Sequence, residues 1–470
     1  MRTRKMRSES TTGALPKLLA PTGVFLALVG AGIIPAQALA ACATVGGSSI
    51  TCTGSDTSYA NGANGLNVTV APGASITVLP LLGGTALSLT GSGVTLTNSG
   101  TIDPALSGLS IVSNGTVVGN TTSASTVNVT NTSTGVMMGS TSSLLVNGPA
   151  LTVYNGTGGT TNITNAGTIG TTGILGFTAG PTAQVVTASG GAQVNFTNSY
   201  GGAINGSVSL APSGTLGTGN TFTNAGTVTG SVSLGAAAGT TNTFNAMTGS
   251  SVGLGVDGGL GGNNTLNLLQ NTATGSPTSG TIAVDAYTNF SNLAVQGGIW
   301  TLNGASTATS ASLTGGTAII NNSASLGTGT IAASGGALQA GTAGLNVLNG
   351  VTLGAGGLAV GGATGLALSG AISGSGALTA NGTGTLTLNG ANTYSGGTNL
   401  TGGGGLMAGA GTALGTGALN VSGAGGFLGT SVSGTTLSNA IGLGTGAALT
   451  LNGASNLGLS GTISGGGGLV

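Results

Sequence analysis

Residues 96–102 read Leu-Thr-Asn-Ser-Gly-Thr-Ile, residues 163–169 read Ile-Thr-Asn-Ala-Gly-Thr-Ile, and residues 222–228 read Phe-Thr-Asn-Ala-Gly-Thr-Val. Each copy begins with an apolar residue and a threonine. An asparagine, a small residue and a glycine come next, and a second threonine and a second apolar residue end the segment. Alternation with period two indicates a β-strand that buries one face. Asparagine followed by glycine favours a turn. Each copy therefore predicts a strand, a turn and a second strand, which make one corner of a coil.

This corner recurs along the chain. Its asparagine stands at Asn98, Asn131, Asn165, Asn198 and Asn224, with separations of 33, 34, 33 and 26 residues. Units of this size bury their apolar face only against their neighbours, so the repetition predicts one stacked β-solenoid instead of separate globular domains. Parallel coils place like residues above like. We therefore expect ladders of Thr, Val and Asn, in which each Asn amide donates to one copy and accepts from another.

The composition agrees with an all-β fold. Of the 470 residues, 99 are Gly and 10 are Pro, 39% are hydrophobic and 2% are charged. This much Gly and Pro is also found in disordered chains. The regular alternation of apolar residues argues against disorder, and no segment after residue 40 has a helical period.

The distribution of charge excludes several functions. All Lys and Arg lie within the first 17 positions, His is absent, and the acids beyond residue 40 are Asp56, Asp103, Asp257 and Asp285. If this amino-terminal segment is removed, the remaining chain has no cation to neutralise phosphates, so we expect no nucleic-acid partner. Without His no Ser/His/Asp or Cys/His site can form, and the aspartates are isolated in sequence. We expect no enzymatic activity, no cofactor and no metal site; an enzyme would need a further catalytic domain.

Residues 1–40 have the three parts of a secretory signal peptide. A basic start precedes an apolar run, and Ala38 and Ala40 place small residues before a cut after Ala40. The alternative is a membrane anchor. Pro21 and Pro35 make the apolar run short and broken for a span of about 20 residues, so the sequence favours cleavage and export.

Cys42 and Cys52 are the only cysteines of the chain. Export places them in an oxidising compartment, and two glycines between them favour a turn, so we predict a disulfide that staples an N-terminal cap over residues 41–65. Closing so short a loop stabilises it by about 2 to 3 kcal/mol. The alternative is a lipoprotein box at residues 39–42, with Cys42 as the lipidated residue.

A glycine-rich stretch, residues 258–266, resembles the calcium-binding nonapeptide of β-roll proteins. Its carboxylate position is Asn264, and the nearest acid is Asp257. Calcium prefers several oxygen ligands including carboxylates, so the stretch is interpreted as a turn between strands.

Residues 384–398 carry the most specific motif, Gly-Thr-Leu-Thr-Leu-Asn-Gly-Ala-Asn-Thr-Tyr-Ser-Gly-Gly-Thr. The alternation predicts that Leu386 and Leu388 point inward and that Thr385 and Thr387 point outward, with a turn from Gly390 to Gly397. Tyr394 is interpreted as a packing residue and not as a ligand-binding residue.

This motif resembles the strand repeat of autotransporter passenger domains. The matching positions are Gly384, Thr385, Leu386, Thr387, Leu388, Gly390, Asn392, Thr393, Tyr394, Gly396, Gly397 and Thr398. The chain departs from the family at Ala380, where Lys is usual, and at Leu400, where Val is common. Neither change affects the alternation.

The resemblance implies a type V secreted protein of a Gram-negative bacterium: an export signal, a right-handed parallel β-helical passenger, and a carboxy-terminal outer-membrane barrel. Seven Phe, five Tyr and one Trp are too few for the aromatic girdles of such a barrel. Residues 460–469 repeat residues 369–378, and the sequence ends at Val470 inside this repeat. We therefore expect that the barrel is missing from this chain.

Together these features predict a signal peptide (1–40), a stapled cap (41–65), an Asn/Thr-rich β-helix (66–290) and a β-helix of strand repeats (291–470). The predicted function is a structural stalk at the cell surface or outside the cell, for adhesion to a host or abiotic surface or for self-association. Its partners would also include the export and barrel-assembly machinery. The alternative is a secreted binding module without a barrel, whose threonine rows contact glycan or ice. The Thr-x-Thr pairs at Thr95 to Thr97 and Thr385 to Thr387 support it.

Overall fold

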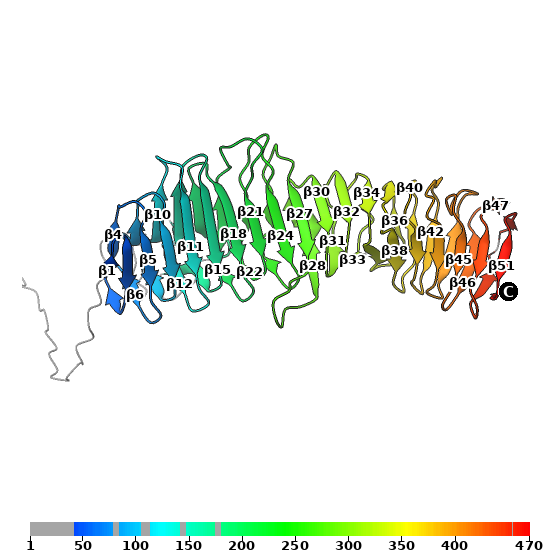
Figure 1. The fold of residues 1–470 in the computed structure, drawn as a ribbon, viewed down its shortest axis with the longest axis horizontal. Coiled ribbons are helices and arrows are strands. Elements are labelled where there is room, and N and C mark those ends of the chain that lie inside the picture. The colour runs from blue at the N-terminus through cyan, green and yellow to red at the C-terminus, as the bar shows by residue number, and fades with distance from the viewer. Residues whose placement is uncertain (1–41, 79–83, 105–112, 142–146, 174–179, 454) are drawn as a thin grey trace, which may run out of the picture. The chain divides into compact units, whose positions relative to one another are not determined.

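The computed structural model describes residues 42–78, 84–104, 113–141, 147–173, 180–453 and 455–470, so the predicted signal peptide lies outside the described residues. The described residues form one unit. Its described part is built of short strands stacked in parallel sheets, with successive coils in chain order (Figure 1). The prediction of an all-β, parallel β-helical fold is confirmed.

Sheet 1 begins with an antiparallel hairpin and continues with parallel strands through most of the stack. Its strands, in spatial order, are β1 (Ala43–Gly46), β2 (Ser49–Cys52), β5 (Asn67–Val70), β8 (Thr95–Asn98), β11 (Thr126–Asn131), β15 (Thr160–Asn165), β18 (Gln193–Asn198), β21 (Thr221–Asn224), β24 (Thr243–Met247), β27 (Thr265–Leu269), β30 (Asn292–Val295), β32 (Ser310–Leu313), β34 (Ile331–Ala333), β37 (Val351–Leu353) and β40 (Ile372–Gly374).

Sheets 2 and 3 complete the coils of the N-terminal part. Sheet 2 contains β4 (Tyr59–Asn61), β7 (Gly84–Leu89), β10 (Ser113–Asn120), β14 (Leu151–Asn155), β17 (Gln184–Ser189), β20 (Ser207–Leu210), β23 (Val232–Ser233), β26 (Val256–Asp257) and β29 (Tyr287–Thr288). Sheet 3 contains β3 (Ser55–Asp56), β6 (Ser75–Thr77), β9 (Thr101–Asp103), β12 (Val136–Thr141), β16 (Thr168–Gly173), β19 (Ala203–Ile204), β22 (Thr227–Val228) and β25 (Ser251–Val252), and β13 (Asn147–Gly148) pairs with β12.

Sheets 4, 5 and 6 belong to the C-terminal part. Sheet 4 contains β28 (Ser279–Ala283), β31 (Ile299–Asn303), β33 (Thr317–Ile320), β35 (Ala337–Ala340), β38 (Leu358–Gly361), β41 (Leu378–Ala380), β43 (Thr398–Leu400), β45 (Leu419–Val421), β48 (Ile441–Leu443) and β51 (Ile463–Gly465). Sheet 5 contains β36 (Leu345–Val347), β39 (Leu366–Leu368), β42 (Thr385–Leu388), β44 (Gly405–Ala408), β46 (Gly426–Thr430), β49 (Ala448–Leu451) and β52 (Gly468–Leu469), and sheet 6 contains β47 (Thr435–Leu437) and β50 (Leu457–Leu459). A short 3₁₀ turn, η2 (Val284–Ala286), precedes β29.

The predicted asparagine ladder is present and determines the register of the coils. Asn98 donates to Asn131, Asn131 to Asn165, Asn165 to Asn198 and Asn198 to Asn224, with N···O distances of 2.8, 2.8, 2.9 and 2.9 Å. These side chains are at most 1% exposed. A slip of one residue would leave several buried amides without partners, so the ladder specifies one register.

The interior is filled by the apolar members of each alternating strand. Strand β15 shows the pattern, with alternate residues buried along its length. The rings of Phe196 and Phe222 stack at 4.7 Å between centroids, and those of Phe222 and Phe244 at 5.5 Å. Like residues therefore lie above like in the core as well as in the polar ladders.

The first coil begins at an earlier residue than the sequence predicted. Strands β2, β3 and β4 pair in parallel with β5, β6 and β7, although they fall inside the segment predicted as a separate cap. Only the β1 hairpin departs from the coil pattern there. The cap is therefore a hairpin on a regular coil, and the stack begins before Leu66.

The coils shorten stepwise along the stack. Ladder partners are 33 residues apart at Asn98 and Asn131, 22 apart at Asn220 and Asn242, and 18 apart at Asn303 and Asn321. Sheet 2 ends at β29, and sheet 5 takes the same place in the circuit, between sheets 4 and 1, from β36 onward. Between β29 and β36 the segments 304–309 and 321–330 cross this side without a strand. We call this place the strand gap.

Candidate binding surface

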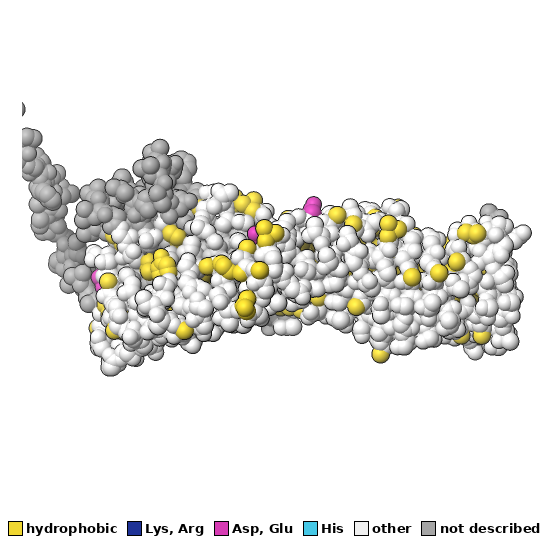
Figure 2. All heavy atoms as spheres, turned by 90° about the horizontal axis from the view of Figure 1, so that it is seen from above, with side chains coloured by type: hydrophobic (Ala, Val, Ile, Leu, Met, Phe, Trp, Pro, Cys, Tyr) yellow, Lys and Arg dark blue, Asp and Glu magenta, His cyan; other side chains and the backbone are white. Residues whose placement is uncertain are grey.

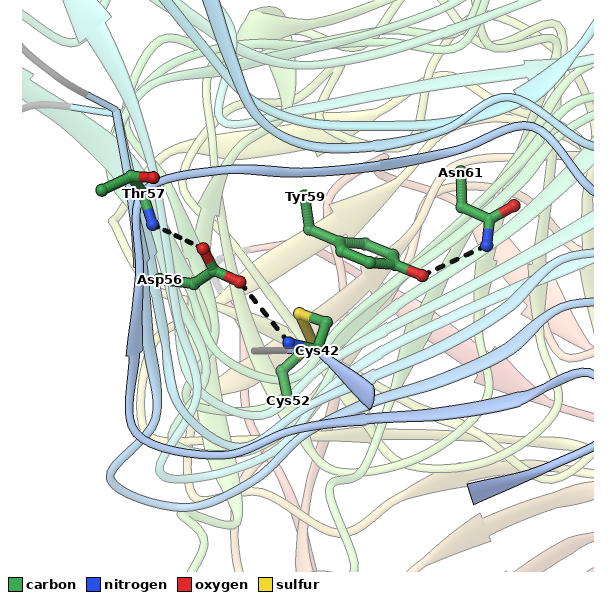
Figure 3. The surroundings of a disulfide bond; sticks show 6 residues. All are labelled: Cys42, Cys52, Asp56, Thr57, Tyr59 and Asn61. Carbon is green, nitrogen blue, oxygen red and sulfur yellow. Dashed lines mark hydrogen bonds between the residues drawn. A yellow bond between two sulfur atoms is a disulfide. The ribbon is translucent and has the colours of Figure 1, made fainter. Parts of the chain in front are cut away.

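The N-terminal hairpin is closed by a disulfide between Cys42 and Cys52. The disulfide lies beside Asp56, whose carboxylate accepts from the backbone N–H groups of Cys42 at 3.4 Å and Thr57 at 2.7 Å (Figure 3). Of the two interpretations of Cys42, the structure contains the disulfide. The bond holds the hairpin over the end of sheet 1, where it covers the edge of β2.

The motif at residues 384–398 is part of the scaffold. Leu386 and Leu388 are 3% and 0% exposed, while Thr385 and Thr387 face outward, as predicted. The segment predicted as a turn is extended instead: the N–H groups of Thr393 and Ser395 donate to residues of β40 at 2.8 and 3.0 Å. It therefore continues the side of the coil that sheet 1 occupies, because its backbone still finds partners in the preceding coil.

Polar groups of the same motif form hydrogen bonds in the interior of the coil, at its corners. Tyr394 is fully buried, and its hydroxyl lies 2.6 Å from the Thr398 hydroxyl, which donates to the carbonyl of Leu414. Burial raises the pKa of the Tyr394 phenol to about 12. The Asn392 amide accepts from the N–H of Ile372 and donates to the carbonyl of Ala413. The prediction that Tyr394 is a packing residue agrees with this burial.

The glycine-rich stretch at residues 258–266 forms a corner between β26 and β27. Asn264 is fully buried, and its amide donates to the carbonyls of Gly259 and Asn289 at 2.6 and 2.9 Å. Asp257 accepts from the N–H of Gly259 at 2.9 Å and from the Asn289 amide at 2.7 Å. These groups satisfy one another, which agrees with a turn between strands.

The most regular surface of the described residues is the outer face of sheet 1. One row of it is threonine in seven consecutive coils. Its members, paired in register, are Thr51, Thr69, Thr97, Thr130, Thr164, Thr197 and Thr223, and the next two coils place Asn245 and Asn267 in the same row. Successive members of one row lie on neighbouring strands, which are about 4.7 to 4.9 Å apart.

A second row lies two residues earlier on the same strands. It contains Thr95, Asn128, Asn162, Asn195, Thr221, Thr243 and Thr265. Here Asn162 donates to Asn128 at 2.9 Å and Asn195 donates to Asn162 at 3.0 Å. We call the two rows together the Thr/Asn face. Hydrogen bonds join several of its side chains, and all of them are half-buried except the exposed Thr197.

The surface carries very little charge. Figure 2 shows scattered hydrophobic and a few acidic side chains on a largely uncharged polar surface. Among the described residues, no group of three or more His, Cys, Asp or Glu side chains comes together. No helix in the described ranges has the length and hydrophobicity needed to cross a membrane.

Sequence reasoning identified the repeating strands but not two features of the surface. It pointed to the Thr-x-Thr pairs at Thr95 to Thr97 and Thr385 to Thr387, whereas the register extends one threonine row over seven coils of sheet 1. The alternating threonines of successive repeats were the available signal. The strand gap was missed as well, since no local motif marks it.

No protein-family model, curated protein or solved structure matches the chain.

Proposed function

We propose that this chain is the exported passenger of a bacterial autotransporter, displayed at the cell surface or released from it. It acts there as a non-enzymatic scaffold for adhesion to surfaces or for self-association. The Thr/Asn face carries this proposal, because it is a long, regular and uncharged surface with rigid backbone spacing. The motif at residues 384–398 and the amino-terminal export pattern support the autotransporter assignment.

The physical role of the face follows from its chemistry. Hydroxyls and amides exchange hydrogen bonds with water for bonds with another surface at little net free energy per contact. Many such contacts in register add up, because the sheet has already fixed the positions of the donors and acceptors. Binding by this face is expected to vary little with ionic strength, since no charged pair is formed or screened.

Display is tested with the native gene in a Gram-negative host. An epitope is inserted at Gly446, where an added Cβ would meet no atom within 4 Å. We expect external protease to remove the epitope from intact cells. Retention of the epitope in the cytoplasm would contradict export.

Adhesion is tested on the same cells with paired substitutions. Thr130→Lys with Thr164→Lys places two adjacent cations on the Thr/Asn face. Thr379→Lys with Asn399→Lys makes the same change on neighbouring strands of sheet 4. At equal display, we expect the first pair to lower attachment or aggregation several-fold and the control pair to leave it unchanged. Equal attachment and aggregation of the two variants would show that the Thr/Asn face is not the adhesive surface.

The threonine row favours a second candidate, a secreted solenoid that binds ice or glycan directly. Its hydroxyls and methyl groups repeat at one spacing along the sheet, as recognition of a periodic surface requires. The discriminating measurement is the growth of ice crystals in purified protein. If the parent protein arrests ice-crystal growth and the Thr130→Lys, Thr164→Lys variant does not, this candidate is favoured. If the parent protein does not alter ice-crystal growth, the adhesion scaffold is favoured.

A further inference from the structure

The strand gap contains two hollows on one side of the coil. The first, of about 460 Å³, is lined by the glycine-rich corner that contains Leu260, by the segment from Thr288 to Ser291, and by Thr307 and Thr309. The second, of about 350 Å³, is lined by residues of the next corners, among them Asn322, Thr328 and Leu348. Both volumes lie in the range of small-molecule sites. The side that sheets 2 and 5 cover elsewhere is therefore indented here.

The two hollows belong to consecutive coils. The N–H of Ser306 donates to the carbonyl of Ala324 at 3.0 Å, and the N–H of Thr328 donates to the carbonyl of Ala308 at 2.9 Å. The corner that carries Thr307 thus lies directly beside the corner that carries Thr328. An extended ligand can contact both hollows without leaving the gap.

The first hollow is held rigid by a strained residue. Asn289 is the non-glycine residue with a positive φ, 59°, in the described ranges. Such a conformation persists only where the surroundings fix it. Asp257 holds the Asn289 side chain at 2.7 Å, and Asn264 holds its carbonyl at 2.9 Å. The wall formed by Thr288 to Ser291 is therefore preorganised.

Three threonine hydroxyls that line the gap have no hydrogen-bond partner among the described residues. They belong to Thr288, Thr307 and Thr328, whose side chains are exposed. Each hydroxyl can both donate and accept. They line a concave surface, where several of them can reach one ligand together.

Apolar side chains and charges near the gap restrict the chemical class of its ligand. Leu260 and Leu348, one at each hollow, are 69% and 72% exposed. The carboxylate of Asp285 lies against Gly304 at the border of the gap, and Asp257 lies behind Asn289. No cation stands in the chain beyond Lys17. The gap therefore offers hydroxyls and apolar side chains to a ligand and repels anions.

We propose that the strand gap is a binding site for a short neutral oligosaccharide. Sugar rings present hydroxyls at their edges and C–H groups on their faces, which match the threonines and the exposed leucines respectively. The site deepens the proposed function by naming a glycan as an adhesion partner, and it rests on that function only for its biological setting. Binding itself requires the folded coils alone.

The test measures binding of purified protein to defined tetrasaccharides by titration calorimetry. The neutral probes are cellotetraose, maltotetraose and mannotetraose, and tetragalacturonate is the anionic probe. We expect at least one neutral probe to bind and the anionic probe to bind at least tenfold more weakly than that one. No binding of any neutral probe at millimolar concentration would overturn the proposal.

Matched variants locate the site. Thr307→Trp and Thr328→Trp fill the hollows from exposed positions, and Thr383→Trp makes the same change at an exposed corner outside the gap. We expect the first two to weaken binding at least tenfold at unchanged urea midpoint, and Thr383→Trp to leave binding unchanged. Leu260→Ser with Leu348→Ser, which keeps all hydroxyls, should weaken binding several-fold.

Equal affinity in the gap and control variants would overturn the assignment of the site. So would binding of an extended peptide in place of the sugars, because it would assign the gap to strand addition at the open edge of β29. Neither result bears on display, which is measured on whole cells. Failure of this site and failure of the proposed function are therefore distinguishable.

Discussion

Individual asparagines stabilise this protein in two different ways. In the buried ladder each amide donates toward the C-terminus, from Asn98 to Asn131 and onward. In the outer row each amide donates in the opposite direction, as from Asn195 to Asn162. The buried amides have no access to water, so each is essential to its neighbours. The outer amides can replace a lost partner with water.

This difference predicts unequal costs for two substitutions on one strand. Asn165→Ala leaves the side-chain N–H of Asn131 and the side-chain oxygen Oδ1 of Asn198 without their ladder partner in the core. We expect it to lower the free energy of unfolding by about 1 to 3 kcal/mol. Asn162→Ala, in the outer row of the same strand, should cost about 0.5 kcal/mol or less. Urea unfolding of both variants is the measurement, and equal midpoints would contradict the ladder's contribution.

Tyr394 gives the stability a dependence on alkaline pH. Burial raises the pKa of its phenol to about 12, against 10.0 for an exposed phenol. The folded protein therefore keeps the proton where the unfolded chain loses it. Stability is unaffected below pH 10 and falls between pH 10 and pH 12, by at most about 1.4 kcal/mol per pH unit for one group.

The check on Tyr394 uses Tyr394→Phe, which lacks the titrating group. Burial raises the pKa of Tyr287 as well, so the parent's total slope has more than one source. We expect the variant to lose stability less steeply than the parent between pH 10 and pH 12. Parallel pH profiles would show that the Tyr394 phenol does not titrate differently on folding.

At the scale of a strand, alternation decides which substitutions are tolerated. On β42, Leu388 is fully buried and the preceding Thr387 faces outward. Leu388→Asp buries a carboxylate in a chain that has no Lys, Arg or His beyond Lys17 to pair with it. We expect a loss of several kcal/mol, about 3 or more.

Thr387→Asp is the matched control, since it adds the same charge to the same strand on the solvent side. It should change the urea midpoint by little, about 0.5 kcal/mol in free energy. A comparable loss in both variants would mean that the inward and outward faces of β42 are assigned wrongly. Circular dichroism should show strand signal without helix in all variants that fold.

At the scale of the whole molecule, stability is expected to be distributed coil by coil. Each coil pairs with the coils on either side of it. A change in one terminal coil therefore alters the stability of the adjacent coils and has little effect on distant ones. The disulfide at the N-terminal hairpin therefore acts locally. It closes a loop with a sequence separation of 10 residues.

Replacing both cysteines tests this local coupling. In Cys42→Ala with Cys52→Ala we expect faster hydrogen exchange in β1 to β4 and unchanged exchange from β30 onward. The reason is that hydrogen exchange reports the opening of a terminal unit separately from the opening of the stack. Uniformly faster exchange along the chain would indicate a globally cooperative fold instead.

The sequence by itself determined the strand faces, the parallel stacking and the asparagine ladder. These features depend on residues at fixed separations, and alternation with period two leaves one arrangement that buries the apolar members. The two cysteines had only each other as partners within the chain.

Only the tertiary structure decided where the sheets begin and end around the coil. The residues of segments 304–309 and 321–330 resemble those of other corners, yet no strand forms there. Whether a side acquires a strand depends on how many residues each circuit contains and on what the coils above and below offer its backbone. That closure is a property of several coils together, so the strand gap, and the oligosaccharide site proposed in it, could not be found from any single repeat.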